Sequence, residues 1–167
     1  YLHDKIFPVL QQVDSTALIF VATRRGCREL FGSLRQQGVP ICELHGDMDQ
    51  RQRDVSLHDF KRKATCVMVA TDVAARGLDI KDVSIVVNFD PAWTEEDYVH
   101  RIGRTGRAGA KGDAYVFLYR RDGYKAQDIV RVMKRCGQAV PAELEDMARS
   151  GGSSRGGGWG GYRGGGG

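Results

Sequence analysis

Short, almost wholly apolar runs alternate along the sequence with longer stretches whose apolar residues recur every three or four positions. Residues 16–23 read TALIFVAT, and residues 41–45, 66–70, 84–89 and 114–119 have the same character. Such runs are typical of strands that are buried on both faces of a parallel sheet. Because parallel strands need crossover connections, which are usually helices, the alternation predicts an α/β fold with helices on both faces of a parallel sheet.

The stretches between the runs carry signals of helix starts and stops. Asp49, with Gln52 three residues later, reads as a variant of the capping box, which opens a helix. Gly38 and Gly137 are placed to end two helices, and a weaker helix is expected after Pro141. Helical spacing predicts that the helix before Gly38 buries Cys27, Leu30, Phe31 and Leu34, and that the helix before Gly137 buries Ile129, Val130, Met133 and Cys136.

The composition changes sharply at residue 150. Residues 150–167 read SGGSSRGGGWGGYRGGGG, with two arginines, no acidic residue and no periodicity. We therefore expect one folded domain over residues 1–149 and a disordered Gly/Arg-rich tail over residues 150–167. The formal net charge of +4 falls to +2 without the tail, because 23 basic residues then face 21 acidic ones. An argument for nucleic-acid binding must therefore rest on where the arginines lie.

The four cysteines indicate a reduced environment. Cys27, Cys42, Cys66 and Cys136 form no CxxC pair, and each lies in an apolar pattern. We expect four reduced core residues, no metal site and an intracellular protein. No apolar run is long enough to cross a bilayer, so no membrane partner is expected. The chain starts without Met in the middle of a pattern, and we expect it to be a piece of a longer protein.

Polar residues follow each of the first four predicted strands. The loops begin with Thr23-Arg24-Arg25, with His45-Gly46-Asp47, with Thr71-Asp72 and then Arg76-Gly77-Leu78-Asp79, and with Asp90-Pro91. The carboxyl ends of parallel strands lie along one edge of the sheet, where ligands of open α/β sheets bind. Hydroxyls, small residues and guanidiniums that recur in four such loops predict a binding site for a polyanion.

Residues 100–109 read HRIGRTGRAG, with three arginines and no acidic residue. Thr94 with Asp97 can cap the start of a helix that contains this segment. His100, Arg104 and Arg107 would then share one helix face, while Gly103 and Gly106 would each cost about 1 kcal/mol relative to alanine in a helix interior. One interpretation is a charged outer face with incidental glycines. The other is a surface that a phosphate-bearing body approaches closely, because the arginine fork binds phosphate oxygens bidentately.

Four segments resemble motifs of the second RecA-like lobe of DEAD-box ATP-dependent RNA helicases, members of superfamily 2. They are LIFVATR at residues 18–24, HGDMDQRQRD at 45–54, VATDVAARGLDI at 69–80, and VVNFDPAWTEEDYVHRIGRTGRAGAKG at 86–112. The four segments occur in the order typical of the family and cover residues 16–112. The sequence CGQAVPAELEDMA at 136–148 is similar to the Dbp2-like branch of the family. The resemblance implies a RecA-like parallel sheet.

The resemblance also implies roles for individual residues. Arg104 and Arg107 would reach the γ-phosphate of ATP held by a first lobe, with Arg107 as the arginine finger, and His100 would join the network between the lobes. Gly77 and Asp79 would lie on the ribose side of ATP. The positions that match those binding the RNA backbone are Thr23, Arg24, Gly46, Gln50, Arg53, Thr71 and Arg76. The RNA contacts would be independent of sequence, and the protein would act in the nucleus or cytoplasm, with the nucleus slightly favoured.

The chain has no GxxxxGK[ST] segment and no DEAD tetrapeptide. The phosphate cradle and the Mg²⁺ ligands are therefore expected on an N-terminal lobe of the same protein, and this chain alone is expected to be inactive. ATP and RNA would each bind across the two lobes, and closure would remodel an RNA duplex. Two alternatives remain at this point, a DNA translocase of the same superfamily and a non-catalytic RNA-binding module that relies on its tail.

Overall fold

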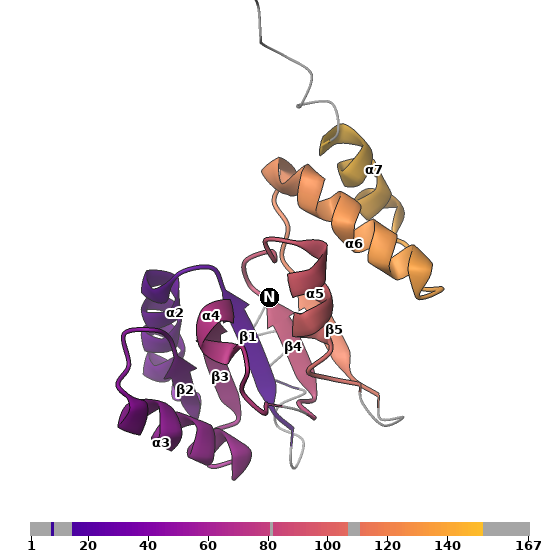
Figure 1. Cartoon of the computed structure of the whole chain (residues 1–167). Helices are drawn as coiled ribbons and strands as arrows, with labels where there is room; N and C mark the ends of the chain where they lie inside the picture. The colour runs from indigo at the N-terminus through magenta and orange to yellow at the C-terminus, as the bar shows by residue number, and fades with distance from the viewer. Residues whose placement is uncertain (1–7, 9–14, 81, 107–110, 152–167) are drawn as a thin grey trace, which may run out of the picture. The chain divides into compact units, whose positions relative to one another are not determined.

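The computed structural model describes residues 8, 15–80, 82–106 and 111–151. Five strands form one sheet in the order β2-β3-β1-β4-β5, and each neighbouring pair is parallel (Figure 1). The strands are β1 (Ala17–Val21), β2 (Ile41–Leu44), β3 (Val67–Thr71), β4 (Ile85–Asn88) and β5 (Asp113–Val116). The predicted α/β fold with a RecA-like parallel sheet is confirmed.

The sheet has an apolar core on each face, as its pleat requires. Leu18 and Phe20 of β1 pack on one face with Phe60 of α3 (Gln50–Lys61) and with Ala74 of α4 (Asp72–Ala75). The alternate residues of β1, including Ile19, pack on the other face against α2 (Arg24–Gln36). Residues on β1 are therefore buried on both sides, and all five of them are at most 2% exposed.

The local signals in the sequence set most of the helix boundaries. Asp49 accepts a hydrogen bond from the Gln52 amide at 2.7 Å, while the Gln52 side chain accepts one from the Asp49 amide at 2.9 Å. This confirms the capping box at the start of α3. Gly38 and Gly137 follow the ends of α2 and of α6 (Gly123–Arg135) with φ of +79° and +67°, which confirms both predicted stops. The predicted helical face of α2 is also confirmed, since Cys27 and Leu34 are buried and Leu30 and Phe31 pack against the same core.

The last strand is shorter than its sequence predicts. β5 covers residues 113–116 instead of the expected 114–119. Its only neighbour among the described strands is β4, which ends at Asn88. Phe117 still donates a backbone hydrogen bond to Asn88 at 3.0 Å, and beyond that point no strand residue is left for the chain to pair with. The apolar run therefore extends past the end of the strand.

The chain divides into two compact units, residues 1–118 and 119–167. The second contains a 3₁₀ turn, η2 (Arg120–Asp122), and two helices, α6 (Gly123–Arg135) and α7 (Ala142–Gly151). Helix α7 confirms the weaker helix expected after Pro141. A Cβ on Gly123 would lie 2.5 Å from the Gly151 Cα, so the start of α6 and the end of α7 are in close contact. The predicted boundary at residue 150 stays a prediction, and residues 152–167 lie outside the described part of the chain.

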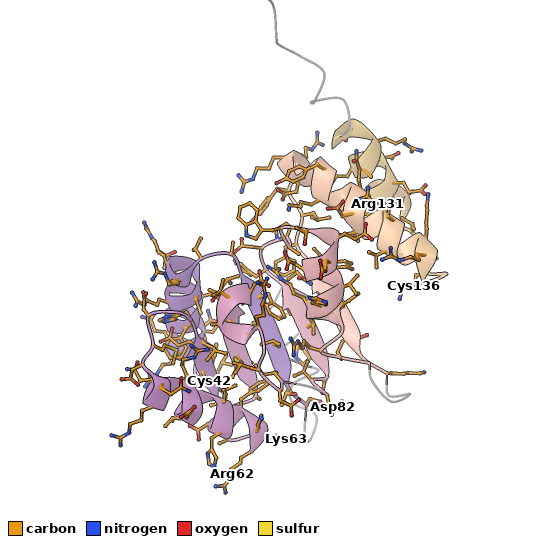
Figure 2. The ribbon with its side chains drawn as sticks, in the orientation of Figure 1. Cys42, Arg62, Lys63, Asp82, Arg131 and Cys136 are labelled. Carbon is orange, nitrogen blue, oxygen red and sulfur yellow. The ribbon has the colours of Figure 1, made fainter. Side chains whose placement is uncertain are left out.

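Two predictions about this second unit are wrong in detail. Helix α6 buries Ile129 as predicted, but its other buried apolar residues are Ala126 and Val132, while the predicted Val130 and Met133 are only half-buried. Cys136 lies at the C-cap of α6 and is exposed, whereas Cys42 lies in β2 and is buried; Figure 2 labels both. The expectation of four core cysteines therefore holds for Cys27 and Cys42, fails for Cys136 and is met only in part by Cys66, which is half-buried.

Candidate functional site

The carboxyl ends of the strands meet at one edge of the sheet, where their loops contact one another. Phe20 of β1 is in register with Ala70 of β3 and with Asn88 of β4, so the residues that follow these strands emerge side by side. The Asp90 carboxylate after β4 accepts a hydrogen bond of 2.7 Å from the Ala22 amide after β1. The predicted convergence of polar loops at this edge is therefore confirmed.

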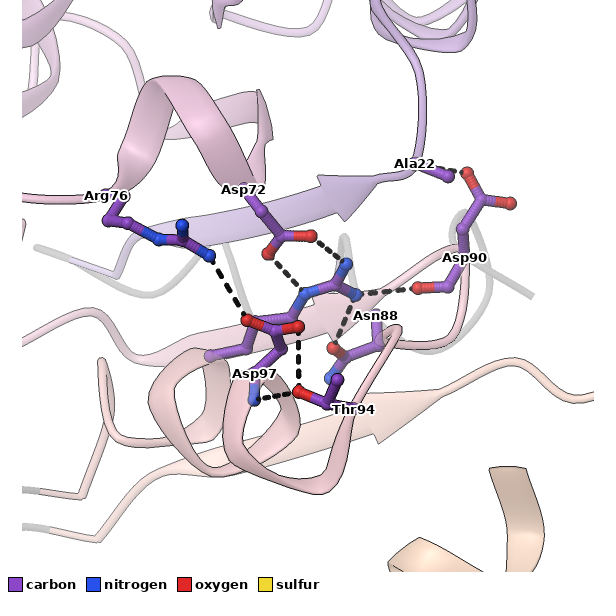
Figure 3. Close-up of polar contacts among 8 residues, drawn as sticks. Ala22, Asp72, Arg76, Asn88, Asp90, Thr94 and Asp97 are labelled. Carbon is purple, nitrogen blue, oxygen red and sulfur yellow. Dashed lines mark hydrogen bonds and ion pairs between the residues drawn. The ribbon is translucent and has the colours of Figure 1, made fainter. Parts of the chain in front are cut away.

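A buried arginine, Arg101, joins the loops at this edge through hydrogen bonds to Asp72, Asn88 and Asp90, the residues that Figure 3 labels around it. Arg101 lies on α5 (Glu95–Ile102) and is 1% exposed. Its Nε and Nη2 donate to the two carboxylate oxygens of Asp72 at 2.7 and 2.6 Å. Its Nη1 donates to Asn88 Oδ1 at 3.0 Å and to the Asp90 carbonyl at 2.7 Å. The guanidinium carbon also lies 5.0 Å from the centre of the Phe20 ring, so one side chain links α5 to β1, to β4 and to the start of α4.

The role of Arg101 was not predicted from the sequence. A signal was present, because Arg101 follows Tyr98 by three residues, and this spacing places both on one face of a helix. Both are buried in the structure. A charge on an interior face needs an ionic partner, and Asp72 and Asp90, each directly after an apolar strand, were the candidate carboxylates.

The helix that begins after Thr94 ends sooner than its sequence predicts. Helix α5 stops at Ile102, Gly103 is its C-cap, and Gly106 has φ of +66°. His100 therefore lies on α5, whereas Arg104 follows its end. The prediction that these side chains share a helix face is wrong, because the glycines release the chain from the helix and do not lie within it. Arg107 lies outside the described residues.

His100 and Arg104 nevertheless line the same cavity, of about 40 Å³. Its other lining residues are Phe20, Asp72, Ala75, Arg76, Asp97 and Arg101. Arg104 Nη1 donates to the carbonyls of Leu78 and Ile80 at 3.0 and 3.2 Å, which directs its side chain to the loop after α4. The His100 ring is exposed, and its Nε2 lies 4.0 Å from a carboxylate oxygen of Glu96.

The loop after α4 brings Arg76 to the same cavity. Arg76 Nη2 lies 3.4 Å from Asp97 Oδ1 (Figure 3). Asp97 is fixed in turn by Thr94, whose hydroxyl donates to Asp97 Oδ2 at 2.8 Å and accepts from the Asp97 amide at 3.0 Å. Gly77 has φ of +76°, a conformation that glycine adopts without the penalty of a Cβ. Asp79 follows in the same loop and is exposed.

Beyond α5, the segment is fastened to the beginning of β4. The Thr105 hydroxyl donates to the carbonyls of Val83 and Ser84, the latter at 3.2 Å. A Cβ on Gly112 would lie 2.0 Å from Thr105 Oγ1, so only glycine fits where the chain passes this anchor. The arginine-rich segment is thus held by Arg101 at the carboxyl end of β4 and by Thr105 at its amino end.

Residues 2–109 match the protein family described as the helicase conserved C-terminal domain. The chain belongs to this family. It is 47% identical over 161 residues to DEAD-box ATP-dependent RNA helicase 30 of Arabidopsis thaliana, covering 95% of this chain and 27% of that protein. It is 46% identical over 157 residues to the ATP-dependent RNA helicase DBP2 of Chaetomium thermophilum, covering 92% of this chain and 28% of that protein. The chain thus spans little more than a quarter of the length of these relatives.

The structure is similar to that of the yeast DEAD-box splicing factor Prp28. The TM-score is 0.77 and the sequence identity 31%, over 88% of this chain and 34% of the Prp28 chain. Together with the sequence relatives, this confirms the resemblance to the C-terminal lobe of DEAD-box helicases and to their Dbp2-like branch.

In this helicase C-terminal domain, three residues assigned to RNA by resemblance lie together at the ends of β1 and β2. The Thr23 hydroxyl caps α2 by accepting from the Gly26 amide at 3.0 Å. Arg24 forms an ion pair with Asp47, and a Cβ on Gly46 would lie 3.7 Å from Arg24 Cδ. The edge of the domain therefore brings Thr23, Arg24 and Gly46 together, while their RNA contacts stay predictions.

The remaining RNA assignments fall on α3 and α4 of the helicase domain. Gln50 Nε2 donates to Asp54 Oδ1 at 2.7 Å, and Arg53 Nη2 donates to the Ala74 carbonyl at 3.3 Å. Thr71 lies at the N-cap of α4 and is 6% exposed, which leaves little of its side chain open to a ligand. These assignments also stay predictions.

Within the described residues, no helix of the helicase domain has both the length and the apolar composition to cross a bilayer. The same residues contain no group of three or more His, Cys, Asp or Glu side chains arranged to hold a metal ion.

Proposed function

We propose that the chain is the C-terminal lobe of an ATP-dependent RNA helicase that remodels RNA duplexes together with an N-terminal RecA-like lobe. The observation that carries this proposal is the cavity that His100, Arg104 and Arg76 share beside the buried Arg101. Arg104, which the resemblance assigns to ATP, and Arg76, which it assigns to RNA, therefore both lie beside the ion pair of Arg101 with Asp72. The names of the relatives, which are ATP-dependent RNA helicases, support the same activity.

In this proposal, Arg104 and Arg107 act on ATP that is bound mainly by the other lobe. A guanidinium that reaches the γ-phosphate stabilises the charge of the phosphoryl-transfer transition state. Gly77 and Asp79 would contact the ribose side of the nucleotide, and His100 would contact the N-terminal lobe. Mg²⁺ would neutralise phosphate charge when bound, and we assign its ligands to the N-terminal lobe because the described residues offer no matching carboxylate group.

RNA would bind through its backbone along the same edge. Thr23 and Arg24 follow β1, Gly46 follows β2, Thr71 ends β3, Arg76 lies at the cavity, and Gln50 and Arg53 lie on α3. Contacts to phosphate and sugar carry no sequence information, so binding would be independent of sequence. Since Arg101 links the loops after β3 and β4 to α5, it would hold the RNA-binding and ATP-binding residues in one fixed arrangement. We also propose an intracellular site of action, in the nucleus or the cytoplasm.

Replacing the proposed arginine finger tests this function. In a protein that carries both lobes, Arg107→Ala should lower RNA-stimulated ATP turnover by about 10³- to 10⁵-fold, equivalent to roughly 4–7 kcal/mol of transition-state stabilisation, and should spare RNA binding. Steady-state ATPase assays and RNA titrations measure the two effects separately.

Arg62→Ala provides the matched control. Arg62 is an exposed arginine at the C-cap of α3, which leads to the opposite edge of the sheet (Figure 2). The control should keep turnover within about twofold of wild type, since surface substitutions away from a site have little effect. An Arg107→Ala protein with more than a tenth of wild-type turnover would refute the finger assignment. Unwinding of DNA duplexes in preference to RNA duplexes would instead favour a DNA translocase.

A further inference from the structure

Helix α2 carries two arginines at a spacing that is unfavourable by itself. Arg24 and Arg28 are four residues apart, so their side chains lie on one helix face, and like charges at this spacing repel by about 0.2–0.5 kcal/mol. Their neighbour Arg25 has an oppositely charged residue at the same spacing, and its Nε lies 2.7 Å from a carboxylate oxygen of Glu29. An anion beside Arg24 and Arg28 would offset this repulsion, whereas Arg25 already has Glu29 as its counter-ion.

Asp47, in the loop after β2, supplies that anion. One of its carboxylate oxygens pairs with Arg24 Nη1, and the other lies 2.8 Å from Arg28 Nη2. Within the described part of the chain, the carboxylate has no further partner. The Asp47 backbone is held separately, because its amide donates to Nδ1 of the buried His45 at 3.3 Å. The loop is thus fixed through its backbone, while its carboxylate can leave the two arginines without unfolding the loop.

Two guanidiniums that converge on one group with two anionic oxygens form the arrangement that binds a phosphate. The side chains of Arg24 and Arg28 are 63% and 57% exposed, so a ligand can reach both. Exposed ion pairs contribute only about 0–1 kcal/mol, so exchanging the carboxylate for a phosphodiester costs little. A neighbouring cavity of about 540 Å³, lined by Arg28, Asp47 and Arg51 among others, leaves room for the nucleotide that carries the phosphate.

We propose that Asp47 occupies the position of an RNA phosphate when the domain is free of RNA, and that Arg28 joins Arg24 in binding that phosphate when RNA displaces the carboxylate. This inference rests on the proposed RNA-binding function. It adds Arg28 to the binding surface and extends the RNA path past Arg24 to the groove between α2 and α3. Asp47 then sets how readily the domain accepts RNA, because each binding event must break its two ion pairs.

Single-stranded oligouridylate, titrated into a protein that carries both lobes and into its variants at several salt concentrations, tests the proposal. Arg28→Ala should weaken binding about 5- to 10-fold and lower the slope of log K against log salt by about 0.7, the change expected for one lost phosphate contact to a single strand. Asp47→Asn should bind several-fold more tightly at low salt, because the competing carboxylate is gone while the shape of the side chain is kept.

Arg25→Ala is the matched control, since it removes an equally charged and more exposed side chain, 89% exposed, from the same helix turn. It should change affinity less than twofold. The proposal is overturned if Arg28→Ala behaves like Arg25→Ala, or if Asp47→Asn binds no more tightly than wild type. If Arg24→Ala still weakens binding in that case, the RNA-binding function stands without this extension. A wild-type two-lobed protein that binds no oligouridylate overturns both. Thermal melts of each variant verify that all of them are folded.

Discussion

Two clusters of arginine and aspartate lie at the same edge of the sheet in opposite environments. The side chains of Arg101 and Asp72 are 2% and 19% exposed, Arg101 Nη1 donates to Asn88 Oδ1 and to the Asp90 carbonyl, and the guanidinium carbon lies over the Phe20 ring. Arg24, Arg28 and Asp47 form a second cluster that is open to solvent. We call these the interior cluster and the surface cluster.

The difference concerns what each cluster can exchange. In a low-dielectric interior, an unpaired charge is so costly that the interior cluster must keep all of its partners. In water, an ion pair is worth little, so the surface cluster can trade one partner for another. Arginine and aspartate thus form permanent ion pairs in the interior cluster and exchangeable ion pairs in the surface cluster. Substitutions that remove one member of each cluster should therefore have very unequal effects on folding.

Arg101→Ala should have the largest effect on stability. Removing one partner of a buried pair leaves the Asp72 carboxylate without its counter-ion, and such losses cost about 3–5 kcal/mol of unfolding free energy. Urea unfolding followed by circular dichroism measures this cost. Arg101→Lys, which keeps the charge but not the fork that binds both Asp72 oxygens, should recover only part of it. A loss below about 1 kcal/mol for Arg101→Ala would erase the distinction between the two clusters.

The pH dependence of the unfolding free energy tests how strongly the interior excludes charge, because two thiols are buried there. Burial raises the pKa of Cys27 and of Cys42 to about 11. Between about pH 9 and 11 the unfolded thiols release their protons while the folded ones keep them, so the unfolded state binds fewer protons and stability falls as the pH rises. The loss should be on the order of 2 kcal/mol for each thiol by pH 11.

Cysteine variants separate this effect from the titration of other groups in the same pH range. Cys42→Ala should flatten the decline of unfolding free energy between pH 8 and pH 10.5, measured by urea unfolding. Cys136→Ala should leave it unchanged, because Cys136 is exposed. Equal slopes for wild type and Cys42→Ala would show that the interior does not resist ionisation at this position.

Asp47→Asn should have the smallest effect on folding. It breaks both ion pairs of the surface cluster but leaves every group in contact with water, so the unfolding free energy should change by less than about 1 kcal/mol. The measurement is the same urea unfolding experiment used for Arg101→Ala. A loss comparable to that of Arg101→Ala would mean that the carboxylate is part of the framework, and it would weaken the case for its displacement by RNA.

Local signals in the sequence were sufficient wherever local interactions decide the structure. The capping box of Asp49 and Gln52 and the two glycine stops act over a few residues, and all are confirmed. The apolar runs predicted the five strands because each run is also a local feature of the sequence. The end of β5 was not predictable in this way, because it depends on where β4, a separate segment, stops offering partners.

The sequence predicted which loops meet at the candidate site but not the contacts between them. The rule for parallel strands indicated which loops converge, but the contacts that organise them join distant residues, such as Ala22 with Asp90, 68 positions apart. The buried role of Arg101 depends on Asp72, 29 positions away, and therefore has no local signature beyond its spacing from Tyr98. Helical periodicity also gave a wrong prediction for the residues after Ile102. Gly103 ends the helix there, whereas the prediction placed it within the helix.

The anchoring of the arginine-rich segment at both ends of β4 makes this motif impossible to transplant by itself. A synthetic peptide of residues 94–106 would keep the Thr94 cap, yet it would lack Asp72, Asn88 and the carbonyls of Val83 and Ser84 that orient its side chains. Grafting the segment onto another scaffold would thus require two further stretches of backbone at matching positions, the start of α4 and residues 83–88 around β4. The smallest portable unit therefore runs from α4 through β4 to the arginine-rich segment, which is a property of the architecture and not of the motif.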